Sequence, residues 1–412
     1  MNDEKIESTI CIIGAGPSGA ATSIFLSKMG IEHIIVDAAT FPRDKVCGDG
    51  LDMKTIRMLH LIDPAIIKEE IYHDNINFAP SWGMRSISAK GVNRDFAYQP
   101  TSGEEWKCPF FVSKRFFFDD FLVKKLDSKT AAIRFGAKVT KIVRDGKQWK
   151  VFANKGNDQA IEITCKLIVG ADGDHSVVLR HLGDRKINRQ HYAGSVRQYW
   201  KNIEGIHEKK LLEFYYPSNI PMGYFWIFPL ANGEANVGYG IPSAIAAKNN
   251  LNIKQIFREL IEKDAALAPR FKNATPIDSI QGWGIPLASL KRKVVGDGWL
   301  LVGDAASMVS PNTGEGIGTG MMTGYIAAKF IERAIKLNQY DEQVLGNYSR
   351  EVYKRLSSEI RHYNFYYQYP GVSNFIINHL ISDSYLNQKG FDYLMKGWLN
   401  TAYNASLTVN LD

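Results

Sequence analysis

The fold is decided near the N-terminus, where residues 9–19 read TICIIGAGPSG. The apolar run at residues 9–13 predicts a buried parallel strand, and residues 20–29 predict a helix with Gly30 as its C-cap. The loop between them follows the GxGxxG pattern and consists of Gly14, Ala15, Gly16, Pro17, Ser18 and Gly19. Glycine at these places permits a tight turn, the approach of a pyrophosphate to the backbone, and close packing of the helix on the strand. The stretch therefore predicts a Rossmann-type unit that binds a dinucleotide.

An acidic residue ends the next predicted strand, residues 34–37. Asp37 lies 23 residues beyond Gly14, which is where a carboxylate binds ribose hydroxyls in such units. Because a carboxylate favours a free ribose 2′-OH, the sequence favours FAD or NAD over NADP.

Composition excludes several function classes. The 412 residues are 45% hydrophobic and 23% charged, which is typical of a globular chain of two or three domains. The net charge of +7 is not concentrated in one stretch, so we expect no nucleic-acid partner. The four cysteines form no CxxC pair and the nine histidines show no HExxH spacing, so we expect no disulfide framework and no metal. The polar N-terminus and the absence of an apolar run of about 18 residues predict a cytoplasmic protein.

Two further motifs decide between FAD and NAD. Residues 170–176 read GADGDHS, with Arg180 following, and residues 301–306 read LVGDAA. Both resemble signatures of the flavoprotein group that includes p-hydroxybenzoate hydroxylase, so the resemblance implies FAD. It also implies that Asp172 and Asp304 bind the cofactor, the latter through the ribityl chain. Gly314, Gly316 and Ile317 open a helix predicted over 316–336, and their backbone would run along the isoalloxazine ring, where helix N–H groups stabilise a reduced flavin.

A fourth set of motifs is similar to the geranylgeranyl reductase family. Residues 45–51 read KVCGDGL, residues 221–229 read PMGYFWIFP and match PxxYxWxFP, and residues 303–317 read GDAASMVSPNTGEGI. The resemblance covers roughly residues 8–335, and the last 75 or so residues carry no motif that we can match. It implies reduction of isolated double bonds in prenyl chains held in a tunnel beside the flavin.

The same resemblance implies roles for single residues. Tyr224 and Trp226 would line the substrate cavity, and Cys47 and Gly48 would lie close to the flavin. The reaction needs a hydride at one alkene carbon and a proton at the other, and Cys47 or Tyr224 could relay that proton. The plainer alternatives are that Cys47 is a small buried hydrophobe and that Tyr224 and Trp226 only pack the sheet.

Two more cofactor contacts follow from the resemblance. Residues 112–119 read VSKRFFFD and resemble the VxRxxFD segment of these flavoproteins, in which the arginine contacts FAD; here it is Arg115, at the start of a helix predicted over 116–127. Its alternative is a surface arginine. Val139 matches a position where the family's backbone meets the adenine, in the first of the strands expected near 137–139, 149–152 and 161–168.

The sequence thus predicts an α/β fold with a p-hydroxybenzoate hydroxylase-like, Rossmann-type FAD-binding domain made of residues 1–75, 107–190 and 286–345. An antiparallel β-sheet domain of residues 76–106 and 191–285 is inserted and would bind the substrate. Residues 346–412 would form a helical C-terminal region, with a break at Pro370-Gly371.

The same scaffold hosts other reactions, so fold alone leaves alternatives open. A flavin-dependent monooxygenase acting on an aromatic substrate remains one. A halogenase is less favoured, because its GWxWxIP motif has Tyr224 here for the first Trp and Phe228 for the Ile. A flavoprotein partner or maturation factor of another protein is a third.

Partners are predicted from the same features. We expect a hydrophobic or aromatic small-molecule substrate. Because only one GxGxxG occurs, an external donor, NAD(P)H or a reduced carrier, must supply electrons. A lipid substrate would bring the protein into peripheral contact with a membrane.

Overall fold

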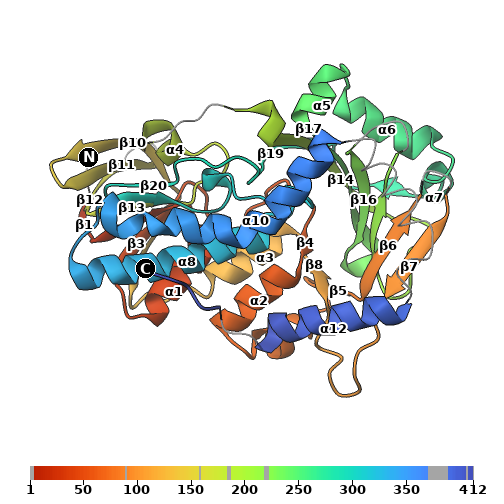
Figure 1. Ribbon diagram of the computed structural model, residues 1–412, viewed down its shortest axis with the longest axis horizontal. Helices are drawn as coiled ribbons and strands as arrows, with labels where there is room; N and C mark the ends of the chain where they lie inside the picture. The colour runs from red at the N-terminus through yellow and green to blue at the C-terminus, as the bar shows by residue number, and fades with distance from the viewer. Residues whose placement is uncertain are drawn as a thin grey trace.

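The computed structural model describes residues 4–88, 91–156, 159–182, 187–217, 222–369, 388–404 and 407–411. Within these ranges the strands form four sheets. Figure 1 shows the sheets that contain the N-terminal strands at one end of the molecule and a large sheet at the other, with long helices between and beneath them.

A six-stranded sheet carries the Rossmann unit. Its strands, in spatial order, are β20 (Val295–Gly296), β21 (Trp299–Leu301), β13 (Leu167–Gly170), β2 (Ile10–Ile13), β3 (His33–Asp37) and β9 (Ala131–Phe135). All neighbours pair in parallel except β20 with β21. Every residue of β2 is buried, as expected of an interior parallel strand covered on both faces.

Two helices cover this sheet close to the glycine-rich loop. Helix α1 (Pro17–Lys28) packs against α8 (Ile317–Leu337). The Thr323 hydroxyl on α8 accepts a hydrogen bond of 3.0 Å from the backbone N–H of Gly303, which lies two residues beyond the end of β21. The start of α8 is thereby fixed to the loop that follows β21.

A four-stranded sheet lies beside the first one. It consists of β1 (Glu4–Glu7), β12 (Gln159–Cys165), β11 (Gln148–Lys155) and β10 (Ala137–Asp145). The prediction of one strand over residues 161–168 is wrong, because the chain leaves this sheet at Lys166 and continues as a separate strand, β13, in the six-stranded sheet. Residues before it pair with β1 and β11, whereas residues after it pair with β2 and β21.

The large sheet has eight strands within the described residues. They are β18 (Thr275–Pro276), β14 (Tyr192–Lys201), β17 (Glu234–Pro242), β16 (Tyr224–Pro229), β15 (Leu212–Tyr215), β6 (Gly83–Ile87), β7 (Asn93–Ala97) and, paired with β14, β19 (Gln281–Pro286). Pairing is antiparallel except between β15 and β6.

Alternation along β16 gives this sheet two different faces. Phe225 points to a buried apolar cluster and stacks on Phe257 of α6 (Ile253–Lys263), with ring centroids 5.8 Å apart. Tyr224 and Trp226 therefore lie on the opposite face. In Figure 1, α5 (Ser243–Lys248), α6 and α7 (Ala268–Phe271) cover the outer side of the sheet.

The remaining elements complete the molecule. A small sheet joins β4 (Gly50–Leu51), β8 (Phe110–Val112) and β5 (Ala79–Ser81). The other helices are α2 (Met53–Ile62), α3 (Arg115–Val123), α4 (Val177–Leu182), α9 (Glu342–Leu345), α10 (Asn347–Gln368) and α12 (Gln388–Asn404). Among the described residues, no helix is both long enough and apolar enough to cross a bilayer.

The predicted fold class is confirmed: a mixed α/β protein with a Rossmann-type unit, a second sheet and a helical C-terminal region. Helix α1 begins at Pro17 rather than residue 20, because proline is well suited to the first turn of a helix. The helix expected over 116–127 ends earlier, at Val123. The expected break at Pro370-Gly371 lies outside the described residues, and the predicted domain boundaries stay a prediction.

Candidate flavin and substrate site

The glycine-rich loop between β2 and α1 has the shape that a pyrophosphate needs. Gly14 has φ +102°, and a Cβ atom on it would lie 2.4 Å from the carbonyl oxygen of Ala171. A Cβ on Gly19 would lie 1.9 Å from the Gly14 oxygen. Beside Gly16, by contrast, the nearest atom is a guanidinium nitrogen of Arg43 at 3.6 Å. The backbone at Gly16 therefore leaves room for a ligand next to the N-terminus of α1.

Asp37 braces this loop from the end of β3. One carboxylate oxygen accepts a hydrogen bond from the Ala15 backbone N–H (2.6 Å), and the other accepts from that of Ala39 (2.8 Å). Each oxygen has a second lone pair with which a ribose hydroxyl could bond. The residue is thus suited to its predicted role while it also orders the loop.

The two other predicted carboxylates lie at neighbouring strand ends. After β13, Asp172 accepts a hydrogen bond of 2.6 Å from the Val177 N–H at the start of α4. Its Oδ1 is buried with no hydrogen-bond partner in the described part of the chain, and burial raises the pKa of this carboxyl. After β21, Asp304 accepts a hydrogen bond of 3.0 Å from Lys45 Nζ. This contact draws the 45–51 loop toward the carboxyl end of the parallel sheet, where such folds bind ligands.

The start of α8 is the segment predicted to lie along the flavin ring. Gly316 precedes the helix and has no side chain that could cap it. Glu315, which the sequence did not single out, accepts a hydrogen bond from the Gly318 N–H. Burial raises the pKa of the Glu315 carboxyl to about 8. The three residues of this segment predicted to contact the cofactor, Gly314, Gly316 and Ile317, all fall within residues 314–317.

Cys47 lies half-buried in the 45–51 loop, beside Arg115. The Arg115 guanidinium lies close enough for its positive charge to act on the Cys47 thiol. It also forms a bidentate ion pair with Asp119 on the same helix, with N···O distances of 2.5 and 2.7 Å. Burial raises the pKa of the Cys47 thiol, and the positive charge of Arg115 opposes that shift. Arg115 is therefore placed to act on Cys47; contact with FAD stays a prediction.

An aromatic wall, defined as Phe214, Tyr224, Trp226 and Phe228 on β15 and β16, faces the same loop. The ring centroids of Tyr224 and Trp226 are 5.8 Å apart, and those of Phe214 and Phe228 are 5.3 Å apart. A Cβ atom on Gly48 would lie 3.6 Å from Phe228 and 3.7 Å from Trp226. The wall and the Cys47 loop are thus immediate neighbours.

Tyr224 connects the wall to the segment before α8. Its hydroxyl donates a hydrogen bond of 2.6 Å to the Thr313 carbonyl. Burial raises the pKa of Tyr224, so the phenol stays protonated at neutral pH. The structure therefore brings Cys47, Tyr224 and Trp226 together with the predicted flavin loops, while Pro221, the first residue of the PxxYxWxFP motif, lies outside the described residues.

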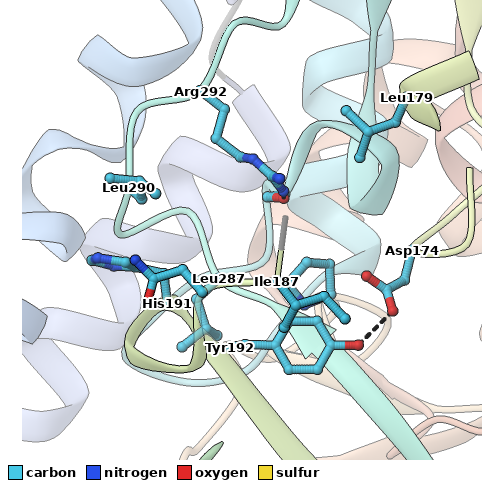
Figure 2. A pocket seen from close by; sticks show the side chains of 11 residues that line it. Asp174, Leu179, Ile187, His191, Tyr192, Leu287, Leu290 and Arg292 are labelled. Atoms are coloured by element: carbon cyan, nitrogen blue, oxygen red, sulfur yellow. Dashed lines mark hydrogen bonds between the residues drawn. The ribbon is translucent and has the colours of Figure 1, made fainter. Parts of the chain in front are cut away.

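A separate surface hollow does not include these residues. It is lined by His191, Tyr192, Leu290 and Arg292, among others, and the Arg292 guanidinium donates to the Ser307 hydroxyl (2.6 Å). Figure 2 shows the Tyr192 hydroxyl bonded to Asp174, and both residues line the hollow. The hollow contains none of the predicted catalytic residues.

Val139 lies at the other end of the proposed cofactor path. It is buried in β10, just before a register shift of that strand. The Gly136 N–H donates a hydrogen bond of 3.0 Å to the Ala39 carbonyl. The start of β10 is thereby fixed beside the residues that follow Asp37.

Known proteins show to which family the chain belongs. A family described as an FAD binding domain matches residues 7–358. A digeranylgeranylglycerophospholipid reductase of Methanococcus aeolicus is 31% identical over 366 residues, covering 86% of this chain and 85% of that protein. The chain belongs to the geranylgeranyl reductase family of FAD-binding flavoproteins.

Two further known proteins are also similar to this chain. A menaquinone reductase of Mycobacterium tuberculosis is 28% identical over 335 residues, covering 78% of this chain and 76% of that protein. A geranylgeranyl bacteriochlorophyll reductase-like protein of Thermoplasma acidophilum has the same fold, with a TM-score of 0.75 at 20% identity over 98% of this chain and 93% of that one. This flavoprotein is therefore an FAD-dependent oxidoreductase, as the sequence predicted.

Proposed function

We propose that this flavoprotein reduces carbon–carbon double bonds in a prenyl chain. Two relatives are named for digeranylgeranylglycerophospholipid and menaquinone, which both carry polyprenyl chains. The observation that carries the proposal is the aromatic wall facing the Cys47 loop. Apolar rings next to an ionisable thiol suit an alkene, which offers no polar group to bind.

We also propose how the chain holds FAD. The glycine-rich loop and the N-terminus of α1 would bind the pyrophosphate, Asp37 the ribose and Asp304 the ribityl chain. Backbone at the start of α8 would lie along the isoalloxazine ring. The other residues proposed to contact the cofactor are Cys47, Gly48, Arg115, Val139 and Asp172.

Cys47 is the proton donor in this proposal. When bound, reduced FAD supplies a hydride to one alkene carbon, so that the π bond breaks and the other carbon takes up a proton. Because burial raises the pKa of Cys47, the thiol carries that proton at neutral pH. The positive charge of the nearby Arg115 guanidinium stabilises the thiolate that remains until solvent protonates it again.

Tyr224 has a positioning role in this scheme. Its hydroxyl already donates to the Thr313 carbonyl, so its proton is engaged in holding β16 against the segment before α8. A phenol whose pKa is raised is also a weaker acid than a thiol beside a guanidinium. Cys47 is therefore the better donor of the two.

The electrons come from a separate molecule, NAD(P)H or a reduced carrier, because the sequence has one GxGxxG loop. A prenyl lipid must be withdrawn from a bilayer, which implies peripheral contact with a membrane. The net charge of +7 favours an anionic lipid surface.

Product analysis tests the proposal. The purified holoprotein is reduced without oxygen and incubated with a geranylgeranyl-bearing phospholipid, and the product is examined by mass spectrometry. We expect a gain of two hydrogens for each reduced double bond. Addition of an oxygen atom to an aromatic compound in air, with no hydrogenation of the lipid, would instead favour the monooxygenase alternative.

A further inference from the structure

One buried amide joins the two parts of the candidate site. Asn236 on β17 is fully buried. Its Nδ2 donates to the Cys47 carbonyl (2.7 Å) and to Asp49 Oδ2 (2.9 Å), and its Oδ1 accepts from the Trp226 indole N–H (2.9 Å). A single side chain thus contacts both the loop that carries the thiol and the ring that would line the substrate cavity.

The partners of this amide fix its orientation. The carbonyl of Cys47 and the carboxylate of Asp49 are acceptors, whereas the indole N–H of Trp226 is only a donor. Rotating the amide by half a turn would place oxygen against two acceptors and NH₂ against a donor. The observed orientation is therefore the only one that satisfies all three partners, and it sets the loop relative to the ring.

Asp49 anchors the arrangement from the loop side. It is fully buried with φ 65°, and the Tyr199 hydroxyl donates to its Oδ2 at 2.7 Å. Its carbonyl accepts a hydrogen bond of 3.0 Å from the Ser113 N–H. The segment Cys47–Asp49 is thus held at both ends by groups from β14, β17 and the segment before α3.

We propose that Asn236 is a positioning residue that sets the distance between the Cys47 thiol and the Trp226 ring, with Asp49 as its anchor in the loop. The catalytic meaning of that distance rests on the proposed function. The positioning itself does not, because it concerns hydrogen bonds within the protein.

Thiol labelling of the folded holoprotein measures the position of the loop without any turnover. Cys47 is half-buried, whereas Cys11, Cys108 and Cys165 are buried, so an Ellman-type disulfide reagent reacts first with Cys47. We expect Asn236→Leu and Asn236→Asp to label about tenfold faster at this site, because about 1.4 kcal/mol of lost hydrogen bonding corresponds to tenfold in an opening equilibrium. Cys47→Ser identifies the signal by removing it.

Two further variants separate positioning from general damage. Asp49→Asn keeps an oxygen that can accept from Tyr199 and Asn236, and asparagine tolerates a positive φ, so its labelling rate should stay within about twofold of wild type. Tyr215→Phe is the matched control. It also removes the hydroxyl of a buried tyrosine of this sheet, one that donates to a carboxylate, Asp264 (2.6 Å), away from the Cys47 loop. It should leave the rate unchanged.

Wild-type labelling in a folded Asn236→Leu protein would overturn the proposal. If both Asn236 variants unfold and expose all four thiols, Tyr199→Phe is tested in their place. A Cys47 labelling rate in Tyr199→Phe equal to that in Tyr215→Phe would then overturn the proposal. Should labelling change as expected while the wild type reduces no prenyl lipid, the proposed function fails and the positioning role stands. With an active enzyme, Asn236→Asp should lower kcat while leaving KM within about twofold.

Discussion

The buried carboxyl of Asp49 makes the stability of the protein depend on pH in a predictable direction. Burial raises its pKa from the ordinary 3.8 to about 6. Hydrogen bonds from Tyr199 and Asn236 oppose this shift, and the positive charges of Arg197 and Arg115 oppose it further. The native state therefore binds a proton more tightly than the unfolded chain does between these two pKa values.

The sign follows from that difference. Well below pH 3.8 the carboxyl is protonated in both states and costs nothing. As pH rises to about 6, the unfolded chain releases its proton more readily, so the native state loses about 3 kcal/mol, at 1.36 kcal/mol per pKa unit. About 2 kcal/mol of this loss lies above pH 4.5. Asp49→Asn has no such titration, so the stability of the variant relative to wild type should rise by about 2 kcal/mol between pH 4.5 and 8.

Urea denaturation of both holoproteins, followed by tryptophan fluorescence at intervals from pH 4.5 to 8, measures this difference. Asp95→Asn is the control: hydrogen bonding to Arg85 lowers the pKa of Asp95, so its titration lies below the window and its difference from wild type should be flat. A flat difference for Asp49→Asn as well would refute the reasoning, because a carboxyl that titrates normally is not buried as described.

Three other predictions concern the cofactor and the reaction. Gly19→Ala should raise the FAD dissociation constant, measured by fluorescence titration, roughly tenfold or more. The new Cβ would lie 1.9 Å from a carbonyl oxygen, and overpacking of this kind costs about 1–3 kcal/mol. The control Gly397→Ala, whose Cβ would meet nothing within 4 Å, should bind FAD as wild type does. Cys47→Ser should slow single-turnover alkene reduction by roughly a hundredfold, the usual effect of losing a general acid, and an undiminished rate would exclude Cys47 as donor. Tyr224→Phe should lower the free energy of unfolding by about 0.5–1.5 kcal/mol, measured by thermal denaturation, because the hydrogen bond to Thr313 is lost. It should slow alkene reduction less than Cys47→Ser does. A larger loss of rate than in Cys47→Ser would make Tyr224 the proton donor.

Local sequence patterns were sufficient for the Rossmann unit. The strand, loop and helix at residues 9–29 lie next to one another in the chain, so apolar periodicity and glycine spacing describe the contacts that form them. The pattern failed at residues 161–168, where one apolar run serves two sheets. Whether such a run bends at Lys166 depends on which strands flank it, and that is a tertiary property.

The hydrogen bonds around Asp49 could not be predicted in the same way. The aspartate pairs with Tyr199 and Asn236 across separations of 150 and 187 residues, and no spacing within a motif encodes such contacts. A signal was nevertheless present, because a charged residue inside a glycine-flanked loop and an asparagine among the apolar residues of a strand are each costly to bury alone. Each such residue predicts a partner without saying which one.

This arrangement separates positioning from substrate fit. Asn236 holds the Cys47 loop through polar groups on the same face of the sheet as the aromatic wall, whereas Phe214 contributes only an apolar ring to that wall. Because Phe214 takes no part in those hydrogen bonds, whereas Phe228 packs beside Gly48 of the loop, we expect changes at Phe214 to move the thiol less than changes at Phe228. On the proposed function, this arrangement would let the wall fit prenyl chains of different size while Cys47 keeps its place; the relatives are named for substrates as different as a glycerophospholipid and a quinone.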